Sequence, residues 1–215
     1  KYGEYSEIEL SIMTQFIKSE DYIFDIGSNI GAFTIPFSKK VGKLGKIYSF
    51  EPQKEIFKLL QENIKQNKLT NVELYRAGLG KKQSSIDLTY IDYSIQDNFG
   101  GVSLLQNLNN PFYPKDEDLK QKIAIMCLDQ FLSIKRCDFI KLDVEGMEQA
   151  VLAGGKKFLN KYRPIMWIEN SRVFPNPLNK YLLDVNYDLY WALSFLFNPD
   201  NYLKSKINYF PNICT

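Results

Sequence analysis

The stretch at residues 22–34, YIFDIGSNIGAFT, constrains the fold more than any other part of this sequence. A short apolar run has the composition of a β-strand and brings Asp25 to its carboxyl end. Gly27 and Gly31 then space a tight turn, and a second apolar run begins a helix. Glycine tolerates positive φ and has no side chain, so such a turn lets a ligand approach the backbone closely. The stretch therefore predicts a strand, a nucleotide-binding turn and the start of a helix.

The glycine spacing of this turn excludes two common nucleotide sites. A dinucleotide fingerprint that starts at Gly27 requires glycine where the chain has Asn29 and Ala32, and the Gly-Lys-Ser/Thr run of a Walker loop is absent. Asp25 would repel a pyrophosphate. It suits the ammonium group and the nearby sulfonium of S-adenosylmethionine (SAM), which carries no phosphate. The turn therefore favours a methyl donor over NAD.

A second acidic residue supports the same cofactor. Residues 46–52, KIYSFEP, place Glu51 at the end of the next predicted strand, about 20 residues beyond the turn, where a carboxylate can accept hydrogen bonds from both ribose hydroxyls. The glycines and both acids fit one adenosine-containing ligand. In the alternative interpretation, Asp25 and Glu51 cap strands and face water.

Length and composition limit the other possibilities. At 215 residues the chain suits one domain with a full core, and we interpret residues 1–215 as a single domain. No segment approaches the ~20 apolar residues that cross a bilayer, and no signal-peptide pattern is present. Cys127, Cys137 and Cys214 have neither metal-site spacing nor a secretory pattern, which predicts a reducing, cytoplasmic setting. A formal net charge of +2 with dispersed lysines does not indicate a nucleic-acid partner.

The sequence contains no histidine, which removes the commonest general base and the commonest transition-metal ligand. Any proton transfer must therefore use a carboxylate, a lysine, a tyrosine or a metal-bound oxygen.

Apolar periodicity predicts alternating strands and helices. Ser6 is a candidate N-cap for an amphipathic helix that ends before Asp21. Further helices are predicted at 32–41, 54–67 and 148–160, and strands at 22–24, 46–50, 72–75, 138–142, 164–168 and 187–193. The pattern predicts an α/β fold with a doubly wound, mostly parallel, Rossmann-like sheet and helices on both faces.

Between residues 84 and 129 the pattern changes. Alternating segments at 86–90 and 122–126 predict a β-hairpin and loop insertion at the rim of the sheet, after strand three. The loop at 98–103, which contains Asn98, Gly100 and Gly101, is predicted to bind the substrate, because long loops in compact domains are often binding segments.

Polar residues follow two further strands. Asp143 and Glu145 come after the strand at 138–142, and Glu169 and Asn170 come after the next one. In a doubly wound sheet these strands lie beside the first, so their carboxyl ends should meet near the cofactor turn. The aromatic residues between 181 and 197 are expected to belong to the core rather than to a sugar-binding surface.

Several stretches together resemble the FkbM-type SAM-dependent methyltransferases. In order along the chain they are DIGSNIGAFT, SFEP, NFGGVSL, DFIKLDVEGMEQAVLAGG and RPIMWIEN. The first run is typical of the broader class I methyltransferase fold, and KLDVEGME narrows the resemblance to this family. It extends over about residues 2–201 and implies methyl transfer from SAM to a hydroxyl of a sugar, a glycan or a small natural product. The family continues into one more antiparallel strand after the segment that matches 212–215, so the sheet edge is expected to be truncated.

The resemblance also implies site residues. It puts Asp25, Gly27, Asn29 and Gly31 around the methionine part of SAM, Glu51 on the ribose, and Asp143 and Glu145 beside the reacting centre. The predicted cofactor site is completed by Glu4, Ser28, Phe33, Thr34, Pro52 and Asp143. The predicted acceptor site contains Asn98, Gly100, Gly101, Asn170, Asn198 and Asp200.

Two mechanisms remain open for activating an aliphatic hydroxyl. In the first, a Mg²⁺ ion is held by the oxygen ligands Asp143, Glu169 and Asn170, and Asp143 or Glu145 receives the proton. In the second there is no metal, Asp143 is the base, and Lys141 or Glu145 orients the acceptor.

Two alternatives to an O-methyltransferase also remain. One is a module that binds SAM without catalysis, and the other is an N-directed methyltransferase. The sequence disfavours the N-directed enzyme because residues 142–145, LDVE, stand where such enzymes carry an Asn-Pro-Pro-aromatic motif.

Overall fold

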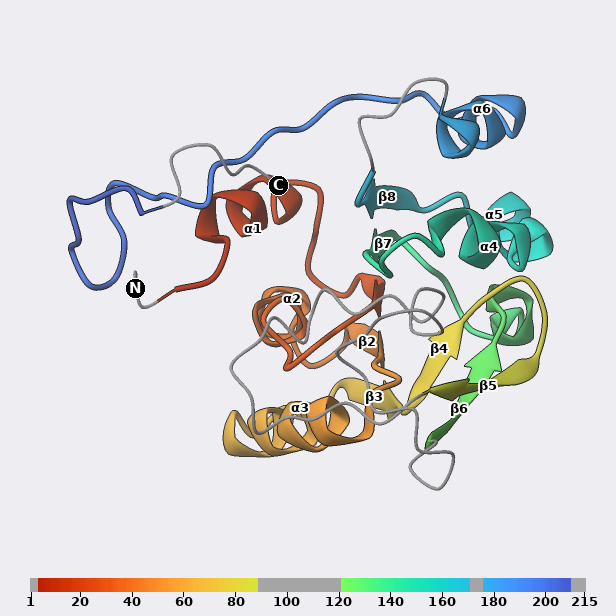
Figure 1. Cartoon of the computed structure of the whole chain (residues 1–215), viewed down its shortest axis with the longest axis horizontal. Helices are drawn as coiled ribbons and strands as arrows, with labels where there is room; N and C mark the ends of the chain where they lie inside the picture. Colours follow the sequence, from red (N-terminus) through yellow and green to blue (C-terminus); the bar gives the residue numbers. More distant parts are fainter. Residues whose placement is uncertain (1–3, 89–120, 171–175, 210–215) are drawn as a thin grey trace.

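A computed structural model describes residues 4–88, 121–170 and 176–209 of the chain. Its centre is a five-stranded, wholly parallel sheet with the order β3-β2-β1-β7-β8 (Figure 1). The strands are β1 (Tyr22–Ile26), β2 (Lys46–Phe50), β3 (Val72–Tyr75), β7 (Phe139–Leu142) and β8 (Ile165–Ile168). The chain order reverses between β1 and β7, and ligands of such sheets bind at this reversal. The predicted doubly wound sheet is confirmed.

Helices cover both faces of this sheet. One face carries α1 (Glu7–Met13), α2 (Thr34–Val41) and α3 (Lys54–Gln66), and the other carries α4 (Glu148–Ala153), α5 (Lys156–Tyr162) and α6 (Pro177–Asp184). Neighbouring strand residues point to opposite layers: Ile23 packs with α1 and α2, whereas Phe24 packs with α5. Both faces are therefore buried, as the apolar strands require.

The predicted rim insertion forms a small second sheet with the order β4-β6-β5. Its strands are β4 (Ala77–Leu79), β5 (Ser84–Leu88) and β6 (Gln121–Met126), and β5 pairs antiparallel with β6 as expected. The parallel pairing of β4 with β6 was not predicted. A 3₁₀ helix, η3 (Leu128–Phe131), returns the chain to the main sheet. The predicted binding loop with Asn98, Gly100 and Gly101 lies outside the described residues.

The helix predicted at 148–160 is in fact two helices, α4 and α5, separated by Gly154 and Gly155. A Cβ atom on Gly154 would lie 2.1 Å from the carbonyl oxygen of Gly80, and one on Gly155 would lie 2.7 Å from Leu128. The two glycines allow the rim sheet and η3 to pack against the break, and the helical pattern alone did not reveal this contact.

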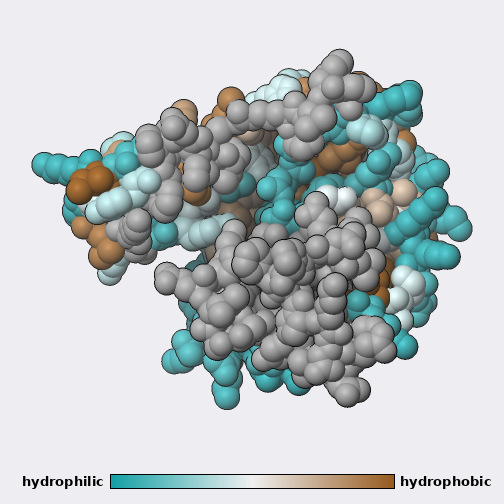
Figure 2. Space-filling view, in the orientation of Figure 1, coloured by the Kyte–Doolittle hydropathy of each residue, from teal (hydrophilic) through white to brown (hydrophobic). Residues whose placement is uncertain are grey.

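The C-terminal part differs most from the prediction. Residues 187–193 are not a strand; the chain leaves α6 and runs past α1 (Figure 1). Tyr190, Trp191 and Phe195 are 90%, 64% and 59% exposed, so the expectation that the aromatic residues between 181 and 197 form core is wrong for these three. Hydrophobic side chains also gather towards the tip of this segment (Figure 2), where Leu203 and Ile207 are exposed. No described strand pairs with the outer edge of β8.

Two helix starts also differ from expectation. Ser6 is the N-cap residue of α1, as predicted, but its φ of 46° is left-handed and its side chain makes no capping hydrogen bond. The unpredicted α6 has a regular N-terminus, in which the Asn176 side chain accepts from the Leu178 N–H and Pro177 is the first helical residue.

In the described part of the chain, no helix is long and apolar enough to cross a membrane.

Candidate cofactor and active site

A cavity of about 1320 Å³ opens where β1, β2, β7 and β8 end, and it continues along β8 to residues 186–193. This is the point at which the strand order reverses. The predicted site residues that line it are Gly27, Ser28, Asn29, Phe33, Glu51, Pro52, Lys141, Asp143, Glu145, Glu169 and Asn170. The sequence therefore identified the polar residues that stand at the ends of β1, β2, β7 and β8, which form one part of the polar wall of this cavity.

The turn at 27–31 satisfies its own backbone donors. All five N–H groups donate to acceptors within the protein. The N–H groups of Gly27 and Ser28 both donate to Phe50 O, and that of Asn29 donates to Glu51 Oε2. The N–H group of Ile30 donates to Asn29 Oδ1, and that of Gly31 donates to Ser28 O. Phosphate-binding loops leave such groups free for the ligand. The turn is therefore unsuited to a pyrophosphate, in agreement with the inference from its spacing.

Gly27 brings the ends of β1 and β7 into contact. Its φ is +81°, and a Cβ atom at this position would lie 1.8 Å from the carbonyl oxygen of Asp143. Beside it, the Ser28 hydroxyl donates to Asp25 O (2.7 Å) and accepts from the Phe50 N–H (3.0 Å). These contacts fix the turn against both neighbouring strands.

Glu51 is held rigidly at the cavity wall. It is 4% exposed, and its carboxylate accepts from the N–H groups of Asn29 (3.1 Å) and Gln53 (2.8 Å). Burial raises the pKa of Glu51 to about 7, although both hydrogen bonds favour the charged form. The carboxylate is fixed where the sequence predicts a ribose.

Asp25 does not reach the cavity. It is wholly buried, with the Thr34 hydroxyl donating to Oδ2 at 2.5 Å and Lys141 Nζ lying 3.9 Å from Oδ1. Burial raises the pKa of Asp25. Its predicted direct contact with the SAM ammonium is therefore corrected to a role beneath the turn. Thr34 and Gly31 likewise do not line the cavity.

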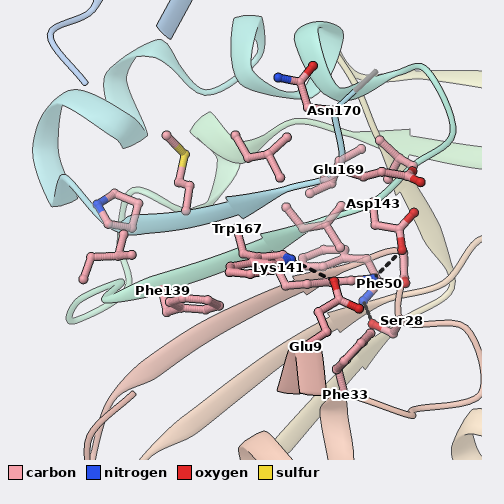
Figure 3. A pocket seen from close by; sticks show the side chains of 18 of the residues that line it. Glu9, Ser28, Phe33, Phe50, Phe139, Lys141, Asp143, Trp167, Glu169 and Asn170 are labelled. Carbon is pink, nitrogen blue, oxygen red and sulfur yellow. Dashed lines mark hydrogen bonds and ion pairs between the residues drawn. The ribbon is translucent and has the colours of Figure 1, made fainter. Parts of the chain in front are cut away.

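Lys141 is the buried cation of the site, and its side chain is 4% exposed. Its Nζ donates to the carbonyl oxygen of Gly27 at 2.9 Å and lies 3.1 Å from Asp143 Oδ2 (Figure 3). It also lies 5.4 Å from the centre of the Phe33 ring. These internal contacts replace the predicted role of orienting the acceptor.

Three carboxylates gather at the ends of β7 and β8. Oxygen atoms of Asp143, Glu145 and Glu169 all lie within 4.8 Å of one another. Asp143 and Glu169 extend to the same side of the cavity (Figure 3). Burial, and then the proximity of Asp143, raises the pKa of Glu169 to about 8. Such a group relieves its repulsion by keeping a proton or by binding a cation.

Asn170 is not a member of this group. Its amide points away from Asp143 and Glu169 (Figure 3). Its Oδ1 accepts from Asn176 Nδ2 and its Nδ2 donates to Asn179 Oδ1, both at 2.5 Å. Asn170 therefore fastens the end of β8 to α6. The predicted oxygen set is corrected: Glu145 takes the place of Asn170.

Three other predicted residues lie away from the cavity. Glu4 accepts hydrogen bonds from Asn198 Nδ2 (2.9 Å) and the Tyr202 N–H (2.8 Å). Asp200 pairs with Lys204 at 2.6 Å. The structure therefore corrects the assignment of Glu4 to the cofactor and of Asn198 and Asp200 to the acceptor. Glu4 and Asn198 join the two ends of the described chain, and Asp200 makes a local ion pair.

The cavity wall also contains residues outside the predicted set, among them Glu9, Trp167 and Tyr5. Trp167 Nε1 donates to Glu9 Oε1 at 2.9 Å, which ties β8 to α1 (Figure 3). The Tyr5 ring packs edge-on against Phe33 with centroids 5.9 Å apart. Burial, and then the charge of Asp143, raises the pKa of Tyr5. No local pattern signals the Glu9–Trp167 pair, because its members are 158 positions apart.

The family comparison agrees with this geometry. The family model for the methyltransferase FkbM domain matches residues 25–189. "Methyltransferase 1" of Beauveria bassiana (strain ARSEF 2860) is 29% identical in an alignment of 151 residues that covers 63% of this chain and 58% of that protein. "Methyltransferase sdnD" of Sordaria araneosa is 27% identical in an alignment of 164 residues that covers 64% of this chain and 61% of that protein. The matches thus span about three fifths of each of these relatives.

A solved structure shows the same fold. The crystal structure of methyltransferase FkbM from Methylobacillus flagellatus KT aligns with a TM-score of 0.54 and 18% identity, over 78% of this chain and 37% of that one. The match of the family model over most of the chain shows that the protein belongs to the FkbM methyltransferase family.

Proposed function

We propose that this protein is a SAM-dependent O-methyltransferase that acts on a hydroxyl group of a sugar, a glycan or a small natural product. The observation that carries the proposal is the division of the cavity wall. A turn without free N–H groups and the fixed Glu51 lie on one side, and the carboxylates of Asp143 and Glu169 lie on the other. The first part suits a phosphate-free adenosine, and the second suits an acceptor that must lose a proton.

The acceptor class rests on the family resemblance. The near-neutral charge of the chain supports a small acceptor over a nucleic acid. The cysteine pattern of the sequence supports a reducing, cytoplasmic setting.

When bound, SAM supplies an electrophilic methyl group on its sulfonium. Glu51 would accept hydrogen bonds from the ribose hydroxyls, and the turn at 27–29 would support the methionine part. The carboxylates would hold the acceptor oxygen in line with the methyl group, at about 3 to 3.5 Å. The Asp143–Glu169 pair would receive the hydroxyl proton as the acceptor oxygen takes the methyl group from the sulfonium, which would leave as the neutral thioether.

The same carboxylates also have the chemistry of a site for a hard divalent cation. Asp143, Glu145 and Glu169 would hold Mg²⁺ through oxygen atoms, and the ion would supply Lewis acidity towards the acceptor hydroxyl.

The first test is cofactor choice, measured by calorimetry with S-adenosylhomocysteine (SAH) and NAD. We expect SAH to bind and to raise the melting temperature, and NAD to have no effect. The second test incubates the protein with SAM and a panel of monosaccharides, glycans and hydroxylated natural products, and detects methylated products by mass spectrometry. Failure to bind SAH would overturn the proposal. Binding without any product across the panel would favour a SAM-binding module.

A further inference from the structure

We infer that Lys141 is a positioning residue that holds the cofactor turn and Asp143 in their working arrangement. The inference rests on the proposed function. It concerns a side chain at the cavity wall that is only 4% exposed. Its three polar contacts join three separate parts of the site: the end of β1, the turn, and the end of β7.

The distances distinguish this role from simple neutralisation of a buried acid. A lysine whose only task was to balance the wholly buried Asp25 would make its shortest contact there. Lys141 Nζ lies 3.9 Å from Asp25 Oδ1, but only 2.9 Å from Gly27 O and 3.1 Å from Asp143 Oδ2. Its two hydrogen-bonding distances therefore go to the turn and to Asp143.

The consequence for the site follows from the sheet geometry. Gly27 and Asp143 stand at the ends of adjacent strands, and the backbone of one nearly touches the other. A single ammonium group bonded to both fixes the turn relative to the carboxylate beside it. The ammonium is buried, so its hydrogen bonds are not exchanged with water and hold one geometry.

Two variants that both lack the charge of Asp25 distinguish the positioning role of Lys141 from simple neutralisation of Asp25. Removing Lys141 alone leaves Asp25 buried without a counter-charge, which is strongly destabilising. Asp25→Asn/Lys141→Met removes both charges, and Asp25→Asn alone is its matched parent. The amide oxygen that Asp25→Asn introduces can still accept from the Thr34 hydroxyl, so we expect both variants to fold with similar melting temperatures.

The measurement is SAH affinity by calorimetry, with the melting temperature recorded for each variant. We expect Asp25→Asn/Lys141→Met to bind SAH about tenfold more weakly than Asp25→Asn. A difference of less than threefold would overturn the inference and reduce Lys141 to the counter-ion of Asp25.

Lys141→Arg is the second variant, and it decides the matter if the double variant does not fold. It keeps the charge but replaces a compact ammonium with a larger planar group. Positioning predicts at least threefold weaker SAH binding, whereas unchanged binding would overturn the inference. A wild-type protein that ignored SAH would instead overturn the proposed function and, with it, this inference.

Discussion

The polar groups in the two halves of the cavity wall differ in how far their hydrogen bonds and charges are satisfied within the protein. At the ends of β1 and β2, every N–H group of the turn donates to an acceptor within the protein, and the carboxylate of Glu51 accepts from two backbone N–H groups. At the ends of β7 and β8, three carboxylates crowd within 4.8 Å, and Lys141 pairs with one of them, Asp143. The first half is built to keep one shape, and the second is poised to gain a proton or a cation. A rigid binding half beside a titratable half is the arrangement that group transfer to a hydroxyl requires.

The largest expected effect comes from breaking the rigid half at Gly27. Gly27→Ala adds backbone strain at φ +81° and places a Cβ atom 1.8 Å from Asp143 O, so we expect a loss of about 4 kcal/mol in the free energy of unfolding. Gly42→Ala is the control, because Gly42 also has positive φ but has nothing within 4 Å of the added atom. It should cost about 2 kcal/mol. Urea denaturation measures both, and equal losses would show that the β1–β7 approach is not tight.

Removing one carboxylate from the titratable half, at the ends of β7 and β8, should lower turnover without weakening SAH binding. Asp143→Asn removes a carboxylate that faces the reacting centre, so we expect turnover to fall about a thousandfold while SAH affinity changes less than threefold. Asp200→Asn is the control, since Asp200 pairs with Lys204 away from the cavity and should leave both quantities unchanged. A matching fall in SAH affinity would place Asp143 in cofactor binding instead.

The pH profile should identify the proton acceptor. The pKa of Glu169 is raised to about 8, so below this pH the group carries a proton and cannot take another. We expect kcat/KM to rise about tenfold per pH unit below pH 8 and to level off above it. Glu169→Gln should remove this limb of the profile. An unchanged limb in that variant would assign the titration to another group.

A smaller pH effect is expected in the rigid half. The pKa of Glu51 is raised to about 7 by burial, and ribose hydroxyls donating to its carboxylate favour the charged form. SAH affinity should therefore weaken as the pH falls below 7, by up to about tenfold per unit. Calorimetry between pH 5.5 and 8.5 measures this, with Glu51→Gln as the variant that should show a flat profile. Affinity that rises on acidification would contradict a carboxylate–ribose contact.

The smallest expected effect is that of metal removal. If the Asp143–Glu169 pair receives the proton, exhaustive EDTA treatment should leave turnover unchanged. Activity that is lost with EDTA and restored by Mg²⁺ would assign the three carboxylates to a metal site instead.

Local patterns predicted much of the fold and of the site because their causes are local. The turn after β1 needs glycine at Gly27, and parallel strands bring their ends to one edge, so Glu51 and Asp143 could be assigned to one cavity in advance. The misassigned residues share a different feature. Asn170, Glu4 and Asn198 carry suitable polar groups, but each is engaged by a partner that no local pattern reveals.

The sequence by itself determined the five strands of the main sheet, the phosphate-free turn and the set of acids at the strand ends, because periodicity and glycine spacing act over a few residues. Tertiary structure alone decided which acids face one another, that Asp25 is sealed beneath the turn and that Lys141 bonds across two strands. Those outcomes depend on burial and on contacts between the ends of different strands, such as that of Lys141 with Gly27 across 114 positions, which the chain acquires only when the sheet is assembled.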